Sequence, residues 1–157
     1  MSANFLALGE FRLLVKMARI AQQSVWQPYR WQASSMFPAE SAPVVSGPDE
    51  QWCPVSVRVY QDELQGYFLN LDTDQPFVFF MVRYPDDNRL SCPTVEEATL
   101  SYDEAARWMD SNEEVQTLPM PEGVRSWLSE LVAERYKPEP KQRKRPRSFV
   151  APEKREG

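Results

Sequence analysis

The apolar run over residues 77–82 constrains the fold of this chain more than any other segment. Its sequence, Phe-Val-Phe-Phe-Met-Val, has no polar residue and is the longest unbroken apolar run in the chain. A strand with only one buried face would alternate apolar and polar residues, so this run predicts a central strand covered on both faces. A helix that crosses a bilayer needs about 20 apolar residues, so we expect no membrane insertion.

Other segments alternate between apolar and polar residues, as half-buried strands do. Residues 11–21 fit both this period and a helical one, and we interpret them as a strand. A further strand is predicted to begin near Tyr29, after Pro28 has removed a backbone donor. Residues 55–60 and 67–71 are predicted to pair as a hairpin, and a last strand is predicted over residues 95–100.

Two helices are predicted to follow these strands. The segment from Ser101 to Glu104 is a capping-box pattern that opens a short helix ending near Ser111. The expected apolar face of this helix consists of Tyr102, Ala105, Ala106 and Met109. A second helix, with Pro121 in its first turn, is predicted to end by Tyr136. Strands followed by helices favour an α+β fold: an antiparallel or mixed sheet, or a small partly closed barrel, with the two C-terminal helices packed on it.

Charge is distributed unevenly along the chain. Residues 1–136 contain ten basic and twenty acidic side chains, whereas residues 137–157 contain eight basic and three acidic ones. The second segment also has four prolines and few apolar residues, which opposes regular structure. We therefore predict a single globular domain over residues 1–136 and a Pro-rich, basic, disordered tail over residues 137–157.

The sequence lacks several residues and motifs that enzymes commonly use for catalysis. Histidine is absent, which removes the commonest general base and the commonest zinc ligand. The five glycines form no phosphate-binding loop. Cys53 and Cys92 form no CxxC pair, and we interpret them as two reduced thiols and ordinary core residues. We expect no enzymatic activity and no cofactor or metal site, and the absence of a signal peptide favours a cytoplasmic location.

The segment Trp26-Gln-Pro-Tyr-Arg-Trp31 is the most unusual local feature. In one interpretation Trp26 and Trp31 are buried at a corner of the core and Arg30 is satisfied internally; in the other the rings form an exposed recognition patch. The first is slightly favoured, and both remain open. The candidate partner-binding residues are Trp26, Tyr29, Arg30 and Trp31, together with Lys141, Arg143, Lys144, Arg145 and Arg147 of the tail.

Several of these segments resemble, in the same order, a bacterial family known as domain of unknown function 3305. The matching pieces are residues 26–31, 66–71 leading into 77–83, 99–105 and 115–121, followed by the last helix and the basic tail. The resemblance implies no established activity. It implies a genomic association, because such proteins are often encoded beside genes for molybdenum-dependent formate dehydrogenase and its maturation factors.

Three hypotheses about function follow. The leading one is a non-catalytic accessory protein whose partner is a formate dehydrogenase subunit or maturation factor. The second is a nucleic-acid-binding protein that acts through the basic tail, which the acidic charge of residues 1–136 disfavours. The third is an enzyme of molybdenum-cofactor biosynthesis, suggested by the names of some relatives and disfavoured by the missing phosphate loop.

Overall fold

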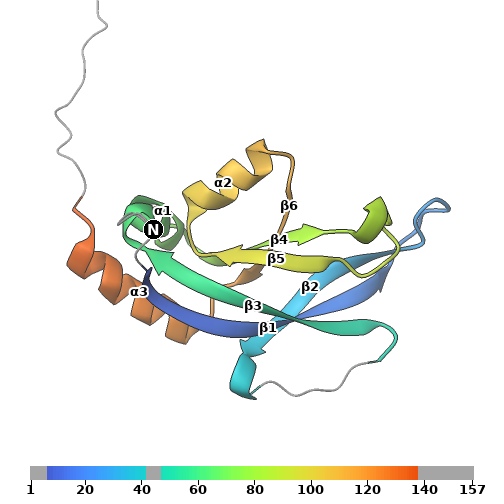
Figure 1. Ribbon diagram of the computed structural model, residues 1–157, viewed down its shortest axis with the longest axis horizontal. Coiled ribbons are helices and arrows are strands. Elements are labelled where there is room, and N and C mark those ends of the chain that lie inside the picture. The colour runs from blue at the N-terminus through green and yellow to red at the C-terminus, as the bar shows by residue number, and fades with distance from the viewer. Residues whose placement is uncertain (1–6, 42–46, 138–157) are drawn as a thin grey trace, which may run out of the picture.

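The computed structural model describes residues 7–41 and 47–137, which form a curved six-stranded sheet and three helices (Figure 1). The strands are β1 (Ala7–Ala21), β2 (Tyr29–Pro38), β3 (Glu50–Tyr60), β4 (Phe77–Arg83), β5 (Thr94–Thr99) and β6 (Glu114–Pro119). The helices are α1 (Leu64–Leu71), α2 (Tyr102–Asp110) and α3 (Glu122–Arg135). Short 3-10 turns occur at Ala39–Ser41, Gln61–Glu63 and Pro85–Asp87.

The sheet is mixed, which is one of the two arrangements that the sequence left open. Its strand order is β2-β1-β3-β5-β4-β6. β3 and β5 are parallel, with Val57 opposite Ala98, and every other pair of neighbours is antiparallel. Residues 11–21 therefore form a strand, and the predicted strands near Tyr29 and over residues 95–100 are also confirmed.

The sheet curls until its two edge strands, β2 and β6, approach each other. The Gln116 side chain bridges them: the Ala33 N–H donates to Gln116 Oε1 over 2.7 Å, and Gln116 Nε2 donates to the Trp31 carbonyl over 3.2 Å. A side-chain amide from β6 thus takes the place of ladder hydrogen bonds at the seam and satisfies two backbone groups on the edge of β2. The result is a nearly closed barrel.

β4 is buried on both faces, which confirms the prediction from residues 77–82. Val78, Phe80 and Val82 point into the main core inside the barrel. The residues between them, Phe79 and Met81, pack with Ala105 and Trp108 of α2 in a second apolar cluster. Figure 1 shows α2 lying over the outer side of β4 and β5, where it covers the second face.

The helices α1 and α3 cover one end of the barrel. Leu64 and Tyr67 of α1, and Leu128 and Val132 of α3, belong to the main core. Figure 1 shows both helices at the end of the sheet opposite the connection between β1 and β2. The α3 prediction is confirmed to within its first turn: Pro121 is the N-cap residue, and Tyr136 the C-cap.

The predicted hairpin over residues 55–60 and 67–71 is wrong, because residues 64–71 form helix α1. The buried members of α1 recur at helical spacing: Leu64, Gly66, Tyr67 and Asn70. The structure thus has three helices in its described residues rather than two C-terminal ones. Tertiary contacts favour the helix, because in α1 the buried Asn70 amide forms hydrogen bonds with distant backbone groups that local propensity does not include.

Those hydrogen bonds join α1 to β4 and to the end of β5. Asn70 Nδ2 donates to the carbonyls of Phe77 and Leu100 over 2.8 and 2.9 Å. The Phe77 N–H donates in turn to Asn70 Oδ1 over 3.1 Å. One buried side chain therefore satisfies three backbone groups where the chain enters β4 and leaves β5.

The start of α2 confirms half of the predicted capping box. The Glu104 N–H donates to Ser101 Oγ over 3.0 Å, as expected for an N-cap serine. The Ser101 N–H, however, donates to Thr99 Oγ1 over 3.1 Å, and the Glu104 carboxylate accepts from the Thr99 hydroxyl over 2.6 Å. The Thr99 hydroxyl therefore bridges the Ser101 N–H and the Glu104 carboxylate, which hydrogen-bond directly to each other in a complete capping box.

The apolar face predicted for α2 is wrong at two positions. Ala105 is buried as expected, but Tyr102 and Met109 are about half exposed, and Trp108 is buried instead. The sheet decides this orientation, because Phe79 and Met81 present an apolar surface that the large Trp108 ring covers. The edge strand β6 was not predicted, since its alternation is short.

Candidate functional site

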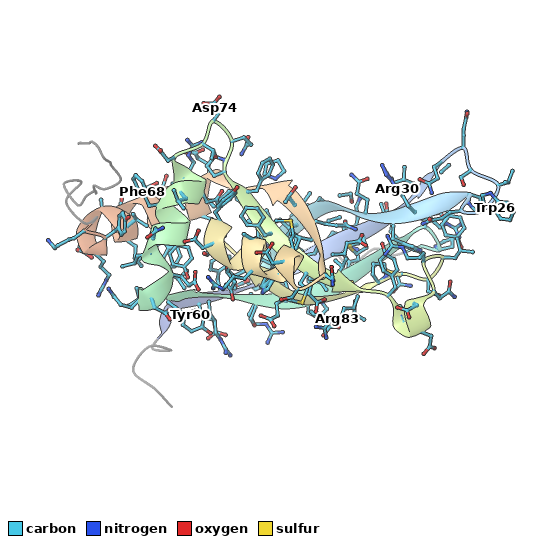
Figure 2. All side chains as sticks on the ribbon, turned by 90° about the horizontal axis from the view of Figure 1, so that it is seen from above. Trp26, Arg30, Tyr60, Phe68, Asp74 and Arg83 are labelled. Atoms are coloured by element: carbon cyan, nitrogen blue, oxygen red, sulfur yellow. The ribbon has the colours of Figure 1, made fainter. Side chains whose placement is uncertain are left out.

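The aromatic segment over residues 26–31 lies at the free end of the β1–β2 hairpin, and each earlier interpretation of it is half right. Trp26 is 90% exposed, whereas Trp31 is only 5% exposed. Tyr29 is half-buried and Arg30 is exposed. Figure 2 shows Trp26 at the tip of the hairpin, with Arg30 nearby, at the end of the molecule opposite Phe68 of α1. Burial of Trp26 and internal pairing of Arg30 are thus corrected.

Internal hydrogen bonds organise the connection that displays Trp26. The Gln22 N–H donates to the Pro28 carbonyl over 2.8 Å, and Gln22 Nε2 donates to the Gln27 carbonyl over 2.8 Å. The Gln27 N–H also donates to Ser24 Oγ over 3.2 Å. This frame leaves Trp26 and its neighbour Val25, which is 88% exposed, in solvent. Two large apolar side chains are therefore presented by an ordered loop.

Arg19 of β1 joins Tyr29 of β2 to Asp49, the residue before β3. The Arg19 guanidinium lies over the Tyr29 ring, with its carbon 4.6 Å from the ring centroid. The Arg19 guanidinium also forms an ion pair with the Asp49 carboxylate, and the backbone N–H of Arg19 donates to the backbone carbonyl of Asp49 over 2.9 Å. Tyr29 thus contributes to the geometry of the hairpin.

A polar pocket of about 400 Å³ lies beside the hairpin, at the seam between β2 and β6. Arg30 and Gln32 of β2 form one wall, and Glu114 and Gln116 of β6 form another. Arg89, from the connection between β4 and β5, completes it. The pocket combines two cations, one carboxylate and amide side chains, which suits hydrogen bonding to a polar ligand surface.

The two arginines of the pocket differ in their pairing. Arg89 forms an ion pair with Glu114 at 2.7 Å and lies over the Tyr84 ring, 4.1 Å from its centroid. Burial, assisted by the Glu114 carboxylate, raises the pKa of Tyr84 above its ordinary value, so that its hydroxyl stays protonated. The backbone of Arg30 pairs with Ile20 in the β1–β2 ladder, but its guanidinium has no hydrogen bond or ion pair with any residue that the structure describes. Arg30 is therefore available to bind an external acceptor.

Trp31 has a structural place in this site. Its indole N–H donates to the Leu90 carbonyl over 3.0 Å, which holds the segment carrying Arg89 against β2. Sequence reasoning therefore singled out residues 26–31 but not the residues of the second pocket wall. Arg89, Glu114 and Gln116 are distant from residues 26–31 in the chain, and no local pattern joins them.

A larger apolar groove, of about 830 Å³, lies between β1, the end of β2 and the start of α3. Phe11, Met36 and Val124 line it and also pack against the main core. We attribute this groove to the edge of the core.

The remaining predicted site residues belong to the tail and lie outside the described residues. They are Lys141, Arg143, Lys144, Arg145 and Arg147. Over residues 7–41 and 47–137, no three Cys, Asp or Glu side chains are grouped so that they could hold a metal ion. No helix in the same ranges is long and apolar enough to cross a membrane.

Comparison with known proteins places the chain in a family. A family model described as "Protein of unknown function (DUF3305)" matches residues 12–145, a range that includes β2, most of β1 and the residues that line the polar pocket. No curated protein and no solved structure matches the chain. Because the match covers most of the sequence, the chain belongs to the DUF3305 family.

Proposed function

We propose that this protein is a non-catalytic accessory protein that binds a protein partner through its hairpin-end surface. This surface consists of Val25, Trp26 and Arg30 together with the polar pocket beside them. The observation that carries the proposal is the exposure of Trp26 at the tip of an ordered loop. Tryptophan and arginine are the residues most often found at the energetic centres of protein interfaces.

Trp26 supplies the apolar part of the proposed interface. An aromatic side chain buries roughly 150–250 Å² at an interface, and apolar burial contributes about 25 cal/mol per Å² before the costs of association. The gross contribution of Trp26 is therefore about 4–6 kcal/mol. The hydrogen bonds that order the loop reduce the entropy that binding must remove, since the tip need not be fixed by the partner.

Arg30 and the pocket supply the polar part. Because Arg30 has no ion pair among the described residues, a carboxylate of the partner can pair with it without first breaking an internal contact. The Arg89–Glu114 pair and the glutamine amides offer further donors and acceptors beside it. We infer a partner with an apolar socket and an acidic group at its rim.

The partner that we propose is a subunit or a maturation factor of a molybdenum-dependent formate dehydrogenase. The support is the genomic association that the family resemblance implies, and the basic tail offers a second contact with an acidic protein surface. The acidic charge of residues 1–136 disfavours nucleic acid as the ligand of the folded domain.

The first experiment is affinity purification of the tagged protein from its native host, both full-length and cut after Tyr136, with mass spectrometry of the proteins that co-purify. Recovery of formate dehydrogenase or maturation proteins supports the proposal. The amount recovered with the shorter form shows how much the tail contributes to binding. If nucleic acid co-purifies instead, and is lost both at high salt and on truncation, the result would reject this proposal in favour of the nucleic-acid hypothesis.

Point variants then test the surface against a recovered partner. Trp26→Ala should weaken binding at least about 30-fold, or roughly 2 kcal/mol, because it removes the anchor. Arg30→Ala should also weaken it. The matched controls are Met109→Ala, an exposed apolar residue of α2, and Arg12→Ala, an exposed arginine of β1. Equal affinity of all four variants and the wild type would reject the hairpin-end surface.

A further inference from the structure

β2 lies at the edge of the sheet, and only part of its outer edge is satisfied. Its ladder neighbour is β1, and on its other side the Gln116 amide bonds to the Trp31 carbonyl and the Ala33 N–H. A residue of a parallel strand placed opposite Gln32 would form the same two hydrogen bonds. Gln116 thus imitates one residue of an added strand, so the edge of β2 is already aimed at a strand neighbour.

The bridge from Gln116 ends before the end of β2. Alternate residues of an edge strand turn their N–H and C=O groups away from the sheet, and over residues 34–38 no described residue bonds to these outward groups. The unpaired edge runs beside the apolar groove of about 830 Å³, which Met36 and Pro38 line from β2 and Val124 lines from α3. An extended segment laid along this edge would pair through its backbone and bury alternate side chains in the groove.

A segment of the chain itself has the length and the chemistry that this edge requires. Residues 147–151, Arg-Ser-Phe-Val-Ala, lie outside the described residues and are bounded by Pro146 and Pro152. Phe149 and Val150 are the only adjacent pair of large apolar residues after Tyr136, and both residue types favour strands. The segment thus offers five residues to the five at the end of β2, and one aromatic ring to the groove.

The segment can reach the groove from the end of α3. The groove lies at the first turn of α3, and this helix has 14 residues, so its last turn is about 21 Å away. The chain advances by 11 residues from Tyr136 to Arg147, which span roughly 36 Å when extended. The connection is therefore long enough to run back along α3.

Charge favours the same contact. Residues 137–147 carry six basic side chains and one acidic one, whereas residues 1–136 carry ten more acidic than basic side chains. Beside the groove, the exposed carboxylates of Glu40 and Glu122 have no hydrogen bond or ion pair with a described residue, and one arginine, Arg12, lies on the same rim. Attraction between the basic connection and the acidic domain would hold the segment near the groove.

We propose that residues 147–151 bind to their own domain as a short added strand on the edge of β2 over residues 34–38, with Phe149 in the apolar groove. The contact would cover a strand edge that is otherwise open to pairing with another chain. Tethering gives the segment an effective concentration of about 1 mM, so a segment that binds as a free peptide with a Kd of about 0.1 mM is docked about 90% of the time. The inference does not depend on the hairpin-end surface, which lies at the other end of β2.

Photocrosslinking of the full-length protein tests where residue 149 lies. With p-benzoylphenylalanine in place of Phe149, crosslinks mapped by mass spectrometry should join this residue to residues 10–13, 36–40 or 121–124. In a mixture of isotopically light and heavy chains, the crosslinks should stay within one chain. No crosslink, or crosslinks to other regions alone, would overturn the inference, and crosslinks between light and heavy chains would replace it with an interface between two copies.

Hydrogen exchange tests the strand pairing in the same full-length chain. The outward amides of residues 34–38 should exchange about 10-fold more slowly in the wild type than in Phe149→Ser, since docking leaves the edge open about one tenth of the time. The matched control in the segment is Ser148→Ala, which should exchange like the wild type. Equal exchange in the wild type and Phe149→Ser would refute the pairing, as would protection that appears only when a partner protein is added.

A variant on the groove side tests the other half of the contact. Gly123 lines the groove, and an added Cβ at this position meets no atom within 4 Å. Gly123→Leu should therefore fill the groove and speed exchange of the outward β2 amides as Phe149→Ser does. Its control is Ser126→Leu, at an exposed position of α3, which should leave exchange unchanged. Phe149→Ser changes no described residue, so it decides the matter even if Gly123→Leu does not fold.

Discussion

Replacing Gly66 by alanine tests the contact between α1 and α2. A Cβ atom at this position would lie 1.9 Å from Ser101 Oγ and 3.0 Å from Ser101 Cβ. Ser101 is fully buried, and two hydrogen bonds fix its hydroxyl: one to Glu63 Oε1 at 2.7 Å and one from the Glu104 N–H at 3.0 Å. The hydroxyl cannot move away without losing both.

The expected cost can be summed from these parts. Loss of the N-cap bond costs about 1 kcal/mol, and loss of the bond to the Glu63 carboxylate about 1.5 kcal/mol. Crowding of a packed contact adds roughly 1–3 kcal/mol, and the higher helix propensity of alanine offsets up to about 1 kcal/mol. The free energy of unfolding should therefore fall by about 3–5 kcal/mol, which corresponds to a melting temperature lower by roughly 10–20 °C.

Urea unfolding, followed by tryptophan fluorescence, measures this change. The matched control is Gly123→Ala in α3, where an added Cβ meets no atom within 4 Å and stability should be unchanged or up to about 1 kcal/mol higher. In a Ser101→Ala background, where the clashing hydroxyl is absent, Gly66→Ala should cost less. Wild-type stability of Gly66→Ala, or the same cost in both backgrounds, would refute the reasoning.

Two further predictions concern buried polar groups. Asn70→Leu should lower the free energy of unfolding by about 3 kcal/mol or more, because three buried backbone groups lose their partner. Gln65→Leu, the same kind of exchange at an exposed position of α1, should change it by less than about 0.5 kcal/mol in the same urea assay. Burial raises the pKa of Glu104, so the folded state holds this proton more tightly than the unfolded state. The stability of Glu104→Gln relative to wild type should therefore increase as the pH rises from the ordinary glutamate pKa through the raised one; a constant difference across a pH series of unfolding midpoints would contradict this.

The candidate site could be predicted only in part from local sequence patterns. Residues 26–31 stood out in the sequence because three large aromatic rings and one arginine are rare in so short a segment. The same pattern could not distinguish Trp26 from Trp31, since their burial depends on which side of the hairpin meets β6 and the segment around Leu90.

The sequence by itself determined the elements whose periodicity agrees with their environment. The doubly buried strand β4, the alternating strands β1 and β3 and the apolar stripe of α3 were all predictable, because in each the side-chain period and the final burial coincide. Tertiary structure alone decided α1, the orientation of α2 and the closure of the barrel. In these three cases the deciding interactions are the hydrogen bonds of Asn70, the packing of Trp108 and the bridge of Gln116. Each joins residues far apart in the chain, so no local window of sequence contains both partners.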